Sequence, residues 1–248
     1  PGDVVKARII RKKKNFLEAK LLEIIKASED RVPPKCRHAG VCGGCSWQQL
    51  PYEKQLEYKR QQVEDHVRRI GKCDTPVNNT LPCEQPFYYR NKMEYSFSPR
   101  RWLSDEEIQR EEFVDDGGFA AGLHAPGRFD KILNLNECHL QDPISFELLD
   151  FVRNYALKHK IDAFDTFEKT GFFRHLVIRK AYHTNDLMVN LVCYFDDQDI
   201  IKDLYVKMMK RFPSITTFIV SINDQPNPTA TGRYQHVLHG PGHIEDHI

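Results

Sequence analysis

Three closely spaced cysteines are the residues most capable of chemistry in this sequence. Cys36, Cys42 and Cys45 lie in the segment PPKCRHAGVCGGCSWQQL, with Gly43 and Gly44 directly before the last of them. A loop with three thiolates can bind either a zinc ion or an iron-sulfur cluster. The tandem glycines permit the backbone turn that such a loop needs. The segment therefore predicts a metal centre whose fourth ligand lies elsewhere in the chain.

Four other cysteines are available as that fourth ligand. Cys138, in NLNECHLQDP, lies at the end of a predicted strand and directly before a helix cap, which is a rigid position. Cys193 lies in the middle of the predicted strand NLVCYF and is expected to be a buried apolar residue. Cys73 and Cys83 flank a polar loop. We therefore predict Cys138 as the remote ligand.

The spacing of the loop cysteines favours a cluster over zinc. Structural zinc sites generally use two pairs of ligands, each about two to four residues apart, and here only Cys42 and Cys45 form such a pair. Iron-sulfur clusters can take three thiolates from one loop and a fourth from a distant segment. Zinc bound by three cysteines and either His38 or His139 stays the alternative. In the cluster interpretation these histidines lie beside the cluster without binding it.

Two local elements flank the cysteine loop. The segments VVKARII and FLEAKLLEII alternate as strands around the turn KKKN, which predicts a hairpin with a basic tip. A helix is predicted from Tyr52, with apolar residues on one side, ending near Gly71. The rest of the chain predicts α+β structure. Its expected strands lie within 92–102, 117–135, 175–182, 187–195 and 217–222, and its expected helices span 143–158 and 199–211.

Composition excludes several classes of protein. With 248 residues and 40% hydrophobic content, the chain can bury a core. It has no apolar run near the roughly 18 residues of a membrane span and no signal-peptide pattern, so we expect a cytoplasmic protein without membrane contact. The net charge of +1 conceals an uneven distribution, because residues 1–35 carry ten Lys or Arg against five Asp or Glu. Such a basic region favours nucleic acid, whereas a run of four basic residues alone, as at 11–14, is more often a solvated turn.

Several segments together resemble a known family. They are RVPPKCRHAGVCGGCSWQQLPYEKQLEYKRQQV, FYYRNKMEYSFS, GLHAPGRFDKILNLNECHLQ and RHLVIRK. This series is similar to the bacterial S-adenosylmethionine-dependent RNA uridine-5-methyltransferases, specifically the iron-sulfur branch that modifies 23S ribosomal RNA. The resemblance implies a 4Fe-4S cluster bound by Cys36, Cys42, Cys45 and Cys138. It also implies that the hairpin is the later half of a TRAM domain, an OB-like RNA-binding barrel.

The expected organisation follows from this resemblance. Residues 1–33 form a partial TRAM domain, residues 34–71 form the iron-sulfur loop and its helix, and residues 72–248 form a central antiparallel β-sheet domain with helices. The chain stops at HGPGHIEDHI, before the expected S-adenosylmethionine-binding domain, and Gly240 with Gly242 does not form a convincing nucleotide loop. We therefore expect a fragment without catalytic residues that is inactive alone, S-adenosylmethionine being bound only by the full-length enzyme.

Basic residues near aromatic ones are the candidate RNA contacts. They are Arg11, Lys12, Lys13, Lys14, Arg90, Lys92, Arg100, Arg101, Arg174 and His175. For Arg174 and His175, internal hydrogen bonds are an equal alternative, because both precede a strand that must be half buried. The expected partner is 23S ribosomal RNA, bound by a monomer.

Three other functions stay open. One is a tRNA uridine-5-methyltransferase of the same family, and another is a zinc-bound RNA-binding module without enzymatic activity. The third is a radical methylthiotransferase that also carries a TRAM domain. The cluster motif of that class has three residues between its first two cysteines, whereas five residues separate Cys36 from Cys42 here.

Overall fold

The structure is a computed structural model that describes residues 2–103, 105–110, 119–128, 130–225 and 229–247. Its contacts divide the chain into two compact units. The smaller unit comprises Pro1–Lys35 and Trp47–Glu84, and the larger unit comprises Cys36–Ser46 and Gln85–Ile248. The predicted segment 34–71 is thus divided, since its cysteine loop belongs to the larger unit and its helix to the smaller one.

Within the described parts of the chain, no helix is long and apolar enough to cross a membrane.

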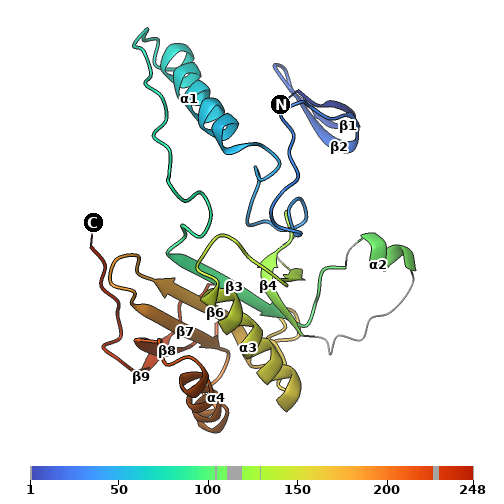
Figure 1. Ribbon diagram of the computed structural model, residues 1–248. Coiled ribbons are helices and arrows are strands. Elements are labelled where there is room, and N and C mark those ends of the chain that lie inside the picture. The colour runs from blue at the N-terminus through green and yellow to red at the C-terminus, as the bar shows by residue number, and fades with distance from the viewer. Residues whose placement is uncertain (1, 104, 111–118, 129, 226–228, 248) are drawn as a thin grey trace. The chain divides into compact units, whose positions relative to one another are not determined.

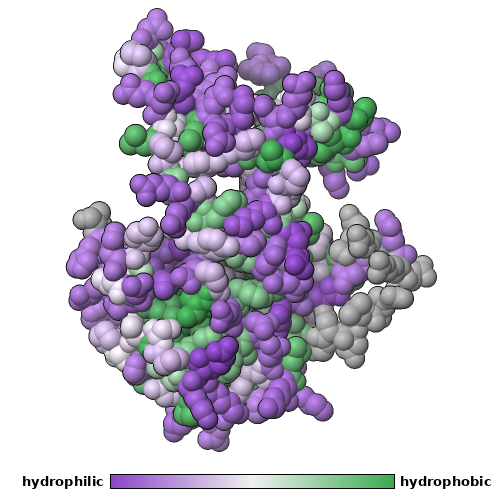
Figure 2. Space-filling model, in the orientation of Figure 1, coloured by the Kyte–Doolittle hydropathy of each residue, from purple (hydrophilic) through white to green (hydrophobic). Residues whose placement is uncertain are grey.

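The smaller unit contains the predicted hairpin and helix. Strands β1 (Val4–Lys12) and β2 (Leu17–Lys26) pair antiparallel, and helix α1 spans Tyr52–Arg69. The helix ends close to the predicted Gly71, where a Cβ would lie 2.7 Å from the carbonyl oxygen of Val67. The hairpin exposes many large apolar side chains, which reach the surface in Figure 2.

The larger unit is built on a sheet with seven described strands in the order β5-β4-β3-β6-β7-β8-β9 (Figure 1). The strands are β3 (Lys92–Ser98), β4 (Ala120–His124), β5 (Ile132–Asn134), β6 (Phe173–Lys180), β7 (Leu187–Cys193), β8 (Thr217–Ile222) and β9 (Tyr234–His239). The helices are α2 (Asp105–Arg110), α3 (Ile144–His159) and α4 (Gln198–Arg211). The predicted α+β class is confirmed.

The prediction of an antiparallel sheet needs a correction. Strands β7 and β8 pair parallel, while the other paired strands of this sheet are antiparallel. The reason is that α4 connects β7 to β8, and a parallel pair requires such a crossover. Helix α2 and strand β9 were not predicted from the sequence. In the acidic segment SDEEIQREEFVDDGG, residues 104 and 111–118 lie outside the described residues.

The core lies on the face of the sheet that α3 and α4 cover (Figure 1). Met93, Tyr95 and Phe97 of β3 point into this core, together with buried residues of both helices. Cys193 is completely buried in it, as predicted for a small apolar residue. Because side chains alternate along a strand, Ser96 and Ser98 of β3 point to the opposite face. That face contributes polar groups to the site described below.

Candidate functional site

The four cysteines predicted as metal ligands lie close together in the larger unit. Cys36, Cys42, Cys45 and Cys138 interact electrostatically in every pairwise combination. None of the four forms a disulfide bond. The chain thus brings a donor from the 136–140 segment to a loop about a hundred residues earlier, as expected from the sequence.

Burial favours the protonated form of three of these thiols, those of Cys36, Cys42 and Cys138. Desolvation raises the pKa of Cys42 to about 11 and raises the pKa values of Cys36 and Cys138. A buried thiol with a raised pKa is a poor nucleophile, and binding to a metal is what would deprotonate it. The backbone amides of His38 and Gly44 donate to the Sγ atoms of Cys36 and Cys42, at 3.4 and 3.3 Å. Amide hydrogen bonds to sulfur also tune iron-sulfur clusters.

Two glycines allow the cysteine loop to lie against β4. The amide of Gly43 donates to the carbonyl oxygen of His124 at 3.1 Å, and a Cβ on Gly43 would lie 2.8 Å from that oxygen. A Cβ on Gly44 would lie 2.9 Å from the Cδ1 atom of Leu123. Neither glycine has a positive φ. The tandem glycines are therefore needed for close approach to the strand, and not for the left-handed turn that glycine usually supplies.

The segment that carries Cys138 is attached to the loop by polar contacts. The backbone amide of Asn136 donates to Nε2 of His38 at 3.0 Å, and the amide of Arg37 donates to the Glu137 carboxylate at 2.7 Å. His38 is thus held by a backbone group through Nε2, and burial lowers its pKa.

His139, which directly follows Cys138, contacts Tyr88. Its Nδ1 lies 2.8 Å from the hydroxyl oxygen of Tyr88, and its ring contacts the rings of Phe87 and Tyr88 edge-on. Each histidine thus has one ring nitrogen bound to a protein group, as histidines that bind a metal and histidines beside a cluster both do, so the choice between the two roles stays a prediction.

The donor set fits a cluster by its chemistry. Across the described ranges, no group of three or more His, Cys, Asp or Glu side chains is found that could hold a metal ion. A 4Fe-4S cluster differs from a single ion because each of its four irons takes one thiolate. The four cysteines supply that number of thiolates, two of them with backbone amides that donate to the sulfur, and their binding of a cluster stays a prediction.

The predicted basic tip lies on the smaller unit. Arg11 and Lys12 end β1, and Lys13 and Lys14 form the turn, all with exposed side chains. The ammonium of Lys13 lies 3.7 Å from the Glu18 carboxylate and 5.0 Å from the centroid of the Phe16 ring. An exposed basic hairpin tip is suited to phosphate contacts.

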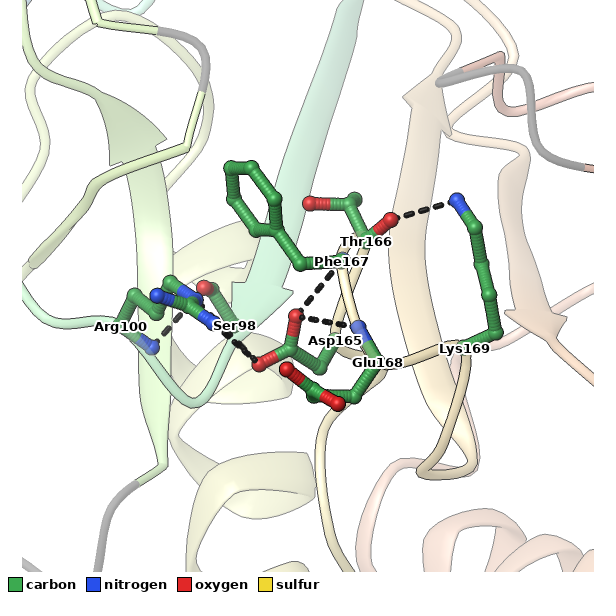
Figure 3. A network of polar contacts seen from close by, with 7 residues as sticks. All are labelled: Ser98, Arg100, Asp165, Thr166, Phe167, Glu168 and Lys169. Atoms are coloured by element: carbon green, nitrogen blue, oxygen red, sulfur yellow. Dashed lines mark hydrogen bonds and ion pairs between the residues drawn. The ribbon is translucent and has the colours of Figure 1, made fainter.

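Arg100 belongs to a network on the larger unit that is shown in Figure 3. Its guanidinium donates from two nitrogens to Oδ2 of Asp165, at 3.1 and 3.2 Å, and lies 4.6 Å from the centroid of the Phe167 ring. The other oxygen of Asp165 accepts from the amides of Phe167 and Glu168. The pKa of Asp165 is lowered by these bonds, although burial opposes them. The network presents a cation and an exposed ring side by side.

The other basic residues around β3 have nearby partners. Arg101 donates to Glu107 at 2.8 Å, Lys92 donates to Glu94 at 2.9 Å, and Nη1 of Arg90 lies 3.7 Å from the sulfur of Met93.

Arg174 and His175 are buried and make internal hydrogen bonds. Arg174 donates to the carbonyl oxygens of Asn223 and Gln225, at 2.6 and 2.7 Å, and its guanidinium lies over the ring of Phe164. Nδ1 of His175 lies 3.1 Å from Oγ of Ser96. Both residues line a pocket with Ser96, His124 and Phe164, residues that sequence reasoning did not select because they are far apart in the chain.

Comparisons with known proteins gave relatives over the whole chain, although no family model matches. The chain is 39% identical to an uncharacterized RNA methyltransferase of Bacteroides thetaiotaomicron, over 98% of this chain and 54% of that protein. It is 38% identical to an uncharacterized RNA methyltransferase of Porphyromonas gingivalis, over 100% of this chain and 54% of that protein. The chain thus spans about half the length of the curated relatives it matches.

A solved structure has a similar fold. It is the tRNA (uracil-54, C5)-methyltransferase of Pyrococcus abyssi in complex with S-adenosyl-L-homocysteine, with a TM-score of 0.65 and 20% identity. The match covers 100% of this chain and 51% of that protein.

Proposed function

We propose that this chain is the RNA-recognition and 4Fe-4S portion of an S-adenosylmethionine-dependent RNA uridine C5-methyltransferase that acts on 23S ribosomal RNA. The observation that carries the proposal is the convergence of four cysteine side chains from two distant segments. The relatives named RNA methyltransferases, similar along the whole chain, support the reaction class. Uridine C5 chemistry and the methyl donor are supported by the resemblance of the cysteine segment and by the name of the solved structure.

The cluster's proposed role is to hold the cysteine loop on the sheet. Cys36, Cys42 and Cys45 would bind it from the loop and Cys138 from the segment after β5. When bound, the cluster supplies a rigid covalent connection between these segments. The chain's own hydrogen bonds, from Gly43 to His124 and from Asn136 to His38, support the same connection without it.

Transfer RNA is the second candidate substrate. It is favoured by one observation, namely that the structure with a similar fold is named a tRNA methyltransferase. Binding of the 248-residue chain to a 23S RNA fragment and to unmodified tRNA, measured at the same salt concentration, distinguishes the two. Tighter binding to tRNA would replace the ribosomal assignment. Three further statements stay predictions: the chain alone transfers no methyl group, it is monomeric, and it is cytoplasmic.

Metal analysis of anaerobically purified protein tests the cluster. We expect iron and acid-labile sulfide in equal amounts and little zinc. Cys138→Ser should lose the iron, whereas Cys73→Ser should keep it, because Cys73 is an exposed thiol of the smaller unit. Stoichiometric zinc without iron would refute the cluster and support the zinc-bound module. Retention of iron in Cys138→Ser would move the fourth ligand elsewhere.

A further inference from the structure

An irregularity in β6 places two successive polar residues at one pocket. The pairing of β6 with β7 shifts register between Phe173 and His175, so Arg174 is an extra residue in the ladder. Phe173 packs in the core, and both Arg174 and His175 line the pocket. A β-bulge reorients side chains in this way and is frequent next to functional sites. The bulge therefore supplies two neighbouring polar groups where a regular strand would supply one.

Three neighbouring strands contribute the polar wall of the pocket. Oγ of Ser96 lies 3.1 Å from Nδ1 of His175 and 3.3 Å from Nε2 of His124, so one hydroxyl joins two imidazoles. The side chain of His175 is 8% exposed and makes no other hydrogen bond within the described residues. Its Nε2 is therefore available to a molecule in the pocket.

Apolar and aromatic groups form the rest of the wall. Phe97, Ile132 and Phe164 line it, and Arg174 lies over the Phe164 ring with 4.4 Å between guanidinium and centroid. At the rim, Thr166 and Ser98 lie beside the network of Arg100 and Phe167, as Figure 3 shows. Flat groups next to a few fixed hydrogen-bonding atoms are the usual recognition surface for an unpaired base.

The charges of the pocket favour an uncharged ligand group over a phosphate. Burial, then the neighbouring Arg174, lowers the pKa of His175 to about 4, so its ring is neutral near pH 7. The cation of Arg174 is already bound to two carbonyl oxygens. Asp130 also lines the pocket, and its carboxylate is paired with the guanidinium of Arg128. A neutral imidazole and a hydroxyl instead suit the edge of a base.

We propose that this pocket, formed by Ser96, His124, Phe164 and His175, binds one unstacked nucleobase of single-stranded RNA. The inference deepens the proposed RNA recognition and depends on it. It assigns His175 to a base edge, in contrast to a contact with the phosphate backbone.

Nitrogen-15 NMR of the histidine side chains tests the pocket directly. The full 248-residue protein, labelled at histidine, is titrated with uridine, cytidine, adenosine and guanosine, and separately with ribose 5-phosphate. We expect at least one nucleoside to shift the Nε2 resonance of His175 and ribose 5-phosphate to leave it unchanged. His239, exposed on β9, is the internal control. An unmoved His175 with every nucleoside, or an equal shift with ribose 5-phosphate, would overturn the proposal.

An RNA oligonucleotide gives the second measurement. We expect His175→Gln and Ser96→Ala to weaken binding of a single-stranded ten-nucleotide RNA by about tenfold without changing its salt dependence, and His239→Gln to have no effect. Removing single bases from the RNA should weaken binding to the wild type at one position and have no further effect at that position in His175→Gln. If removing a base weakens binding to His175→Gln as much as binding to the wild type at every position, the proposed base pocket is contradicted. Failure of the wild type to bind any RNA would instead contradict the proposed function, since the nucleoside titration reports on the pocket alone.

Discussion

The amide of Gly43 donates a hydrogen bond to the carbonyl oxygen of His124 at 3.1 Å and so attaches the cysteine loop to the end of β4. His124 also lines the proposed base pocket through its side chain. One residue of β4 thus contacts the candidate metal centre through its backbone and the candidate RNA site through its imidazole. Changes that displace the loop should therefore affect both sites.

The first prediction is that Gly43→Ala destabilises the loop and lowers its iron content. A Cβ at this position would lie 2.8 Å from the His124 oxygen, so either the loop moves or the hydrogen bond breaks. We expect a loss of about 1–3 kcal/mol in the free energy of unfolding. Chemical denaturation and iron analysis measure the two effects. Val41→Ala, at an exposed position of the same loop, is the control, and equal iron in both variants would contradict the prediction.

The second prediction concerns acid stability. The pKa of His175 is lowered from 6.5 to about 4 by burial and by Arg174 and His124, while Glu94 opposes the shift. The unfolded chain therefore binds a proton between these values that the folded protein does not, so stability is present above pH 6.5 and falls as the pH approaches 4. Between pH 6.5 and 4, the wild type should lose up to about 3 kcal/mol more than His175→Gln. Chemical denaturation at the two pH values measures the free energy of unfolding. If the wild type and His175→Gln lose the same amount between pH 6.5 and 4, the prediction is wrong.

The sequence predicted local structure better than relationships between distant segments. Periodicity located β1, β2, α1 and α4 because each has its own pattern of apolar residues. It missed β9 because this strand has largely exposed side chains and no apolar repeat. The parallel pairing of β7 and β8 depends on the path of α4, which no local pattern specifies.

The two candidate sites also differ in how far a local sequence pattern could predict them. The cysteine loop has a recognisable spacing, and Cys138 could be selected by its position beside a predicted helix cap. The pocket has no such pattern, because Ser96, His124 and His175 come from three strands and meet only through sheet pairing and the bulge at Arg174. Internal hydrogen bonds of Arg174 and His175 were one of the two alternatives predicted from the sequence. The sequence could not indicate that both residues would line a pocket.

The third prediction is that the hairpin tip contributes charge to RNA binding. Changing Lys12, Lys13 and Lys14 together to Glu should weaken binding and reduce the slope of log affinity against log salt by up to about 2–3, since each lost phosphate contact removes roughly 0.7–0.9. Fluorescence anisotropy at several salt concentrations measures the slope. The same change at Lys158, Lys202 and Lys210 is the matched control, because these lysines are also exposed and give the same change in net charge. Equal effects of the two triple variants would show that only net charge matters.

The fourth prediction assigns stacking to Phe167. Its ring is 53% exposed and lies under the guanidinium of Arg100, which two hydrogen bonds to Asp165 hold in place. A base that stacks on this ring contacts an oriented aromatic surface beside a fixed cation, a combination that binds single-stranded nucleic acid with little sequence preference. Phe167→Ala should therefore weaken binding of single-stranded RNA by about five- to tenfold, with the salt slope unchanged.

The control for Phe167 is Phe195→Ala. Phe195 is 46% exposed, and its ring contacts Phe172 with no arginine over it among the described contacts. We expect this variant to bind RNA like the wild type. Asp165→Asn gives a complementary test, because it weakens the ion pair that orients Arg100 while leaving the Phe167 ring in place. An intermediate loss in Asp165→Asn would show that the orientation of Arg100 contributes to stacking. If Phe167→Ala and Phe195→Ala bind RNA equally, the surface formed by Arg100 and Phe167 does not contact the RNA.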